Sequence, residues 1–95
     1  MTTLTLDLQH EVIIIHPELL PQDDEFELWG QVFLHHDAVE LIEFSTGADR
    51  HLWRFTFNDS YFNLNFEHYS NSVWIAPDGV DALDLLPSLH KNLSR

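Results

Sequence analysis

The sequence predicts an α+β domain, a two-layer sandwich in which two helices cover one face of a mainly antiparallel sheet of about five strands. The expected order is strand, helix, four strands, helix. Two observations lead to this fold: consecutive segments between His51 and Ile75 alternate apolar and polar residues, and segments with apolar residues at helical spacing stand before and after the strand-rich part. The length of 95 residues suits one domain, residues 1–95, with a small core.

The segment from His51 to Ile75 is predicted to form three antiparallel strands at the centre of the sheet. For the apolar residues of the first two strands to share a face, their loop must contain two residues, Asn58 and Asp59, or four. A two-residue loop before the third strand would place Trp74 on the opposite, polar face. The residues expected on the buried face are Trp53, Phe55, Phe57, Phe62, Leu64, Phe66, Val73 and Ile75.

The N-terminal half is expected to supply one long strand and one helix. Residues 4–15 are extended in character, and their alternation changes phase near His10, so a bulge or bend is expected there. The helix should begin with Asp24 as N-cap and Glu27 as its capping-box partner. An apolar stripe should pack on the sheet, and Gly30 should allow a close approach beside Trp29. The stripe consists of Phe26, Trp29 and Phe33, with Val32 and His36 at its flanks.

Two further elements are expected on either side of the central strands. Residues 39–45 predict a strand with a small bulge or a covered edge, because Leu41 and Ile42 put two large apolar groups on opposite faces. Asp78 should cap a final helix, in which Pro87 either causes a kink or begins a second short helix. The apolar stripe of that helix consists of Val80, Leu83, Leu86, Leu89 and Leu93.

The composition limits the classes of partner. Sixteen acidic and four basic residues give a formal net charge of −12, which disfavours direct binding to nucleic acid or an anionic membrane and favours a basic protein. Cysteine is absent, so disulfides and thiolate metal sites are excluded. We expect a cytoplasmic protein, because no secretory signal and no apolar run of about 20 residues is visible.

The common catalytic motifs, including phosphate-binding glycine loops and H-E-x-x-H, do not occur. The sequence therefore favours a protein that is not an enzyme, and we expect no catalytic residue, no cofactor and no assigned metal. Histidines and carboxylates still converge at one predicted hairpin end, where a small ligand or metal is one interpretation and a structural ion pair between Arg50 and Glu67 is the other. The residues concerned are Asp49, Arg50, His51, Glu67 and His68.

Three other groups of polar residues have a functional and a structural interpretation. His35, His36 and Asp37 contain metal-binding side chains but stand at adjacent positions, which suits a solvated helix end better than one metal site. The polar sheet face, with Arg54, Thr56, Asn63, Asn65 and Trp74, is either a ligand-binding surface or simply the solvated side of the sheet. An acidic patch for a partner consists of Asp23, Asp24, Glu25 and Glu27, extended by Asp37 and Glu40.

The motifs GADRHLW and NFEHYSNSVWI resemble a family of small, uncharacterised gamma-proteobacterial proteins, a domain of unknown function. The resemblance extends from about Trp29 to Trp74. It implies a single bacterial cytosolic domain without an assigned activity, and it draws attention to Asp49, Arg50, His51 and Trp74.

Three functional hypotheses follow. The first is a non-catalytic adaptor or regulator that binds a basic protein partner through its acidic surface or its polar sheet face. The second is a domain that binds a small ligand or metal with the Asp49, Arg50, His51, Glu67 and His68 cluster. The third is a mimic of nucleic acid, which would require acidic groups spaced like phosphates.

Overall fold

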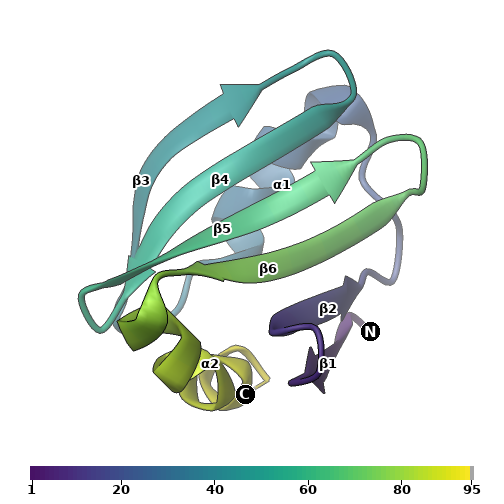
Figure 1. Ribbon diagram of the computed structural model, residues 1–95. Coiled ribbons are helices and arrows are strands. Elements are labelled where there is room, and N and C mark those ends of the chain that lie inside the picture. The colour runs from purple at the N-terminus through teal and green to yellow at the C-terminus, as the bar shows by residue number, and fades with distance from the viewer. Residues whose placement is uncertain (95) are drawn as a thin grey trace.

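The computed structural model describes residues 1–94 and consists of one six-stranded antiparallel sheet and two α-helices (Figure 1). The strand order across the sheet is β1-β2-β6-β5-β4-β3, so β1 and β3 are its edges. The elements are β1 (Thr3–Asp7), β2 (Val12–His16), the short 3-10 helix η1 (Asp23–Glu25), α1 (Phe26–Phe33), β3 (Val39–Thr46), β4 (Arg50–Phe57), β5 (Ser60–Glu67), β6 (Ser72–Asp78) and α2 (Val80–Leu93).

The predicted α+β class and the packing of two helices on the sheet are confirmed. In Figure 1, α1 lies behind β4 and β5, whereas α2 lies below the end of β6, near β1 and β2. Buried side chains from the two helices and from β2, β4, β5 and β6 join in a single core cluster. Within residues 1–94, no helix combines the length and the apolar character that a membrane span requires.

The central meander forms as predicted. Trp53 pairs with Leu64 and Phe55 with Phe62. The β4–β5 loop contains only Asn58 and Asp59, both with positive φ angles of 50° and 68°. The β5–β6 loop has four residues, 68–71, rather than two. Because both lengths are even, the same side chains stay buried, and Trp74 lies on the opposite face as expected.

The prediction of one long N-terminal strand is wrong, because residues 3–16 form the hairpin of β1 and β2. The phase change near His10 marks a turn, where Glu11 has a φ of 60° and the Asp7 carboxylate accepts a hydrogen bond from the His10 backbone N–H at 3.1 Å. The sheet therefore gains a sixth strand. The N-terminal hairpin joins the sheet through β6, so neither of its strands pairs with β3.

The first helix packs as expected but begins differently. Gln22 precedes η1, and its backbone N–H donates to Glu25 Oε1 at 2.9 Å, so the predicted capping box of Asp24 and Glu27 is wrong. The aromatic stripe is confirmed by ring stacking of Phe26 on Trp29 and of Trp29 on Phe33, with centroids 5.9 and 5.0 Å apart. Val32, predicted to flank this stripe, instead faces solvent.

The close approach of α1 to the sheet at Gly30, next to Trp29, is confirmed, and the residue that it meets on the sheet is Trp53. A Cβ atom at Gly30 would lie 2.9 Å from Trp53 Nε1 and closer still to Cδ1. Trp53 Nε1–H in turn donates to the Glu27 carbonyl at 2.9 Å. The absence of a side chain at Gly30 thus allows the indole ring to lie directly against the helix backbone.

For β3 and α2, some of the predictions are confirmed and others are wrong. A register shift between Leu41 and Glu43 confirms the bulge in β3. Gly79, with a φ of 107°, is the N-cap of α2, so the prediction of Asp78 in that role is wrong. Pro87 lies inside a single helix assigned from Val80 to Leu93. Val80, which was predicted to join the buried stripe, is exposed, and Ala82 is buried in addition to Leu86, Leu89 and Leu93.

Candidate functional site

The predicted cluster of histidines and charges is divided between the two faces of the sheet. Arg50 and His51 are adjacent on β4, and successive side chains of a strand point to opposite faces. On the open face, Arg50 pairs with Glu67 at 3.0 Å, and its guanidinium lies 5.5 Å from the Trp74 ring centroid. This is the ion pair of the structural interpretation. His51, the next residue along β4, lies on the core side of the sheet.

On the core side, three side chains converge from separate parts of the chain: Asp23 of η1, His51 of β4 and His68 of the β5–β6 loop. We call these residues the histidine cluster. The two imidazole rings meet edge to face with centroids 4.6 Å apart, and His68 Nδ1 pairs with Asp23 Oδ1. One potential ligand atom from each residue lies within 4.8 Å of the other two.

His51 is held rigidly within this cluster. The residue is only 8% exposed, and its Nδ1 forms a hydrogen bond with Thr46 Oγ1 at 2.6 Å. Its Nε2 is buried and has no hydrogen-bond partner among residues 1–94. The rings of Phe26, Phe44 and Phe66 surround it, with centroids 5.9–6.1 Å away. The free nitrogen is therefore preorganised in an apolar environment, in which an unpaired polar atom is costly.

Asp49 contributes to this region through its backbone. Its carbonyl oxygen accepts a hydrogen bond from the His68 backbone N–H at 3.0 Å, which fixes the start of the β5–β6 loop. Asp23 was predicted to belong to the acidic patch, and nothing in its sequence position linked it to His51 or His68. It joins them because residues 17–22 lead the chain from β2 to η1 beside the β5–β6 loop.

On the polar face of the sheet, the charged groups interact with neighbouring side chains of the same face. Arg54 pairs with Asp78 at 3.0 Å and lies 4.7 Å from the Tyr61 ring centroid. Asn65 is buried and donates a hydrogen bond to the Asn63 carbonyl at 3.1 Å. These contacts engage Arg54 and the Asn65 amide, whereas Asn63 Oδ1 is buried without a hydrogen-bond partner among residues 1–94. The pairing of Arg54 and Asn65 with their neighbours supports the solvated-surface interpretation of this face.

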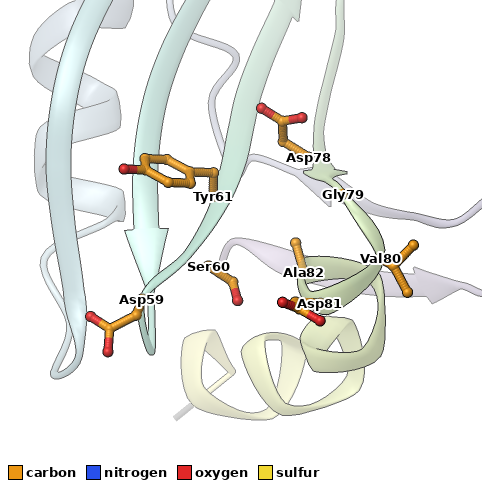
Figure 2. A pocket seen from close by; sticks show the side chains of 8 residues that line it. All are labelled: Asp59, Ser60, Tyr61, Asp78, Gly79, Val80, Asp81 and Ala82. Carbon is orange, nitrogen blue, oxygen red and sulfur yellow. The ribbon is translucent and has the colours of Figure 1, made fainter.

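A hollow at the opposite end of the sheet is lined by three aspartates (Figure 2). Asp59 lies at the β4–β5 turn, on the other side of the hollow from Asp78, while Asp81 comes from the first turn of α2. Asp78 is the partner of Arg54, and the other two carboxylates belong to exposed residues. The hollow is thus a solvated acidic surface.

The outer side of α1 and the segment before it expose a group of large apolar side chains, which we call the apolar surface. It consists of Leu19, Leu20, Leu28 and Val32, with exposed fractions of 82%, 40%, 66% and 69%. Together with Pro21, Trp29, Asp24 and Glu25, these side chains line one surface hollow of about 480 Å³. This surface was not predicted from the sequence, although the position of Leu28 off the aromatic stripe of α1 is a signal for it.

The predicted acidic patch lies along this same segment. Asp24, Glu25 and Glu27 are exposed, whereas Asp23 turns to His68. The His35, His36 and Asp37 group follows the end of α1, and the Asp37 carbonyl accepts a hydrogen bond from Asn92 Nδ2 at 3.0 Å. Throughout residues 1–94, the histidine cluster is the one set of three side chains with metal-ligand spacing.

Comparison with protein families places the chain in a family. Residues 1–91 match the model described as "Protein of unknown function (DUF3630)", and the chain belongs to this family. The match extends well beyond the Trp29 to Trp74 region in which the motifs suggested a resemblance, and it confirms a domain of unknown function. No curated protein and no solved structure matches the chain.

Proposed function

We propose that this member of the DUF3630 family is a non-catalytic adaptor or regulator that binds a basic protein partner through the apolar surface on α1. The observation that carries the proposal is the exposure of Leu19, Leu28 and Val32 in one hollow edged by Asp24 and Glu25. Contiguous apolar patches rimmed by polar residues are typical of interaction sites. We further propose that the protein acts in the cytoplasm of gamma-proteobacteria, as the motif resemblance implies.

The chemistry of the surface defines the partner. Apolar side chains at the centre would desolvate an apolar anchor, and carboxylates at the rim would attract lysine or arginine beside it. An amphipathic helix with basic residues along the edges of its apolar stripe has both features. The net charge of −12 would accelerate the encounter with such a segment at low ionic strength.

The test is a pull-down from a native bacterial lysate at low salt and then at about 0.5 M salt, where the Debye length falls to about 4 Å. We expect the wild-type protein to retain a basic partner and to lose it at high salt. The Leu28→Ser, Val32→Ser double variant should fail to retain the same partner. Val80→Ser is the matched control, because Val80 is 75% exposed on α2, away from the apolar surface.

The charged rim requires its own comparison. Asp24→Asn combined with Glu25→Gln should weaken binding of the purified partner, whereas Asp81→Asn combined with Asp84→Asn on α2 should weaken it less. Equal effects of the two pairs would mean that net charge, rather than this surface, attracts the partner. A partner retained equally by the Leu28, Val32 variant and by Val80→Ser would refute the proposed surface.

A further inference from the structure

We propose that the histidine cluster is a binding site for a divalent first-row transition-metal ion, with Zn²⁺ as the ion whose chemistry fits it best. The ligands are His51, His68 and Asp23. The site is independent of the apolar surface and needs no partner protein. Two imidazoles and one carboxylate form the mixed nitrogen and oxygen ligand set that Zn²⁺ accepts, and such a set leaves a fourth position open to water or another ligand.

The unpartnered Nε2 of His51 supports a metal ion at this site. Thr46 Oγ1 holds Nδ1 at 2.6 Å, so Nε2 is the ring nitrogen left without a partner. Metal-binding histidines in proteins almost always use the other ring nitrogen in a hydrogen bond that fixes their orientation, as Thr46 does here. An ion pair between His68 and Asp23 alone satisfies those two residues but leaves Nε2 of His51 buried and unsatisfied.

The distances within the histidine cluster suit a zinc ion. Zinc bonds to nitrogen and oxygen are about 2.0–2.2 Å long, so tetrahedral ligands lie roughly 3.4 Å apart. The three potential ligand atoms already lie within 4.8 Å of one another, so the longest separation between two of them must shorten by no more than about 1.4 Å. The Asp23 side chain is 71% exposed and can rotate by this amount, while His51 stays fixed.

Phenylalanine rings surround the two histidines of the cluster. Phe26, Phe44 and Phe66 enclose His51, and the Phe66 ring lies 4.9 Å from that of His68. An apolar shell restricts water and strengthens the interaction between an ion and its ligands. The open side of the site is the exposed Asp23, which provides an entry path for the ion.

In the experiment, Zn²⁺ is titrated into the untagged full chain, and binding is measured by calorimetry and by thermal unfolding. We expect one ion per chain and a rise in the melting temperature of roughly 10 °C or more at a hundredfold excess over the dissociation constant. His68→Ala should lower the affinity more than about 100-fold, beyond the usual effect of removing a residue that only orients a ligand. Thr46→Val, which removes the orienting hydroxyl, should lower it by about 10-fold to 100-fold.

The matched control is the His35→Ala, His36→Ala double variant, which removes two histidines outside the cluster and should bind Zn²⁺ like the wild type. Because His51 is buried, His51→Gln is tested beside His51→Ala. A second measurement needs no variant: Zn²⁺ should shift the NMR signals of the His51 and His68 imidazoles in the wild type. Failure to bind one Zn²⁺, unchanged binding by His68→Ala, or loss of binding in the control variant would each overturn the proposal. None of these readouts involves a partner, so they are separate from any failure of the proposed adaptor function.

Discussion

Replacing Gly30 by alanine tests how closely α1 lies against the sheet. The added Cβ would lie 2.9 Å from Trp53 Nε1 and closer to Cδ1, distances that a packed structure does not tolerate. The indole ring cannot simply move away, because it is 7% exposed, lies 5.3 Å from the Phe44 ring, and donates its N–H to the Glu27 carbonyl at 2.9 Å. Relief of the clash moves α1 outward or shifts the indole ring, and either movement lengthens this hydrogen bond.

The expected cost follows from three effects. Overpacking typically costs about 1–3 kcal/mol, and the loss of a hydrogen bond costs about 1 kcal/mol. Alanine inside a helix returns about 1 kcal/mol relative to glycine. The sum is a net loss of about 2 kcal/mol, which for a domain of this size lowers the melting temperature by roughly 8–16 °C.

The assay is thermal and urea unfolding of Gly30→Ala beside Gly47→Ala. Gly47 is the matched control, because a Cβ there meets only the Arg50 carbonyl oxygen at an ordinary 3.5 Å. We expect Gly47→Ala to change stability by less than about 0.5 kcal/mol or to increase it slightly. In a Trp53→Phe background the effect of Gly30→Ala should shrink, since the two positions are in contact. A Gly30→Ala protein as stable as the Gly47→Ala protein would refute the close packing.

Two other predictions concern the ends of the chain. Pro87→Ala should raise the free energy of unfolding by about 1–3 kcal/mol, because Pro87 is exposed inside α2 and lacks the N–H that its helical position would use. A variant with a lower melting temperature than the wild type would contradict this. The hydrogen bond from the His10 ring to the Asp7 carboxylate, at 2.8 Å, lowers the pKa of Asp7, so His10→Ala should raise that pKa in an NMR titration. Because the pKa of Asp7 is lowered in the folded protein, the stability that this contact adds is present above the ordinary pKa of Asp7. It is lost as pH falls through the lowered value. The free energies of unfolding of the wild type and of His10→Ala should therefore converge in acid.

The centre of the fold could be predicted because the alternation of β4 and β5 leaves few choices. Apolar residues at every second position must share a face, and only a loop with an even number of residues allows this for Phe57 and Phe62. The same parity argument placed Trp74 correctly even though the loop before it was two residues longer than expected.

The N-terminal hairpin was missed because its turn contains no glycine or proline. A tight reversal at Glu11 uses a positive φ of 60°, which non-glycine residues adopt less often, and the hydrogen bonds between Asp7 and His10 stabilise the turn instead. The change of phase near His10 was visible in the sequence and fits either a bulge or a turn. Only the pairing of Leu4 with Ile15 and of Leu6 with Ile13 distinguishes the two.

The candidate metal site combines what strand alternation can predict with what it cannot. Alternation alone separates Arg50 from His51, and pairing along the hairpin places Arg50 opposite Glu67, so the division of the predicted cluster could have been read from the sequence. Asp23 is different, since it precedes His51 by 28 positions and reaches it through an irregular segment whose path no periodicity describes. That path is fixed by tertiary packing, in which Pro21 and Phe26 are buried on either side of η1. These two anchors hold the backbone of η1 beside the β5–β6 loop, which is why a carboxylate that looks like part of an acidic patch lies next to two histidines.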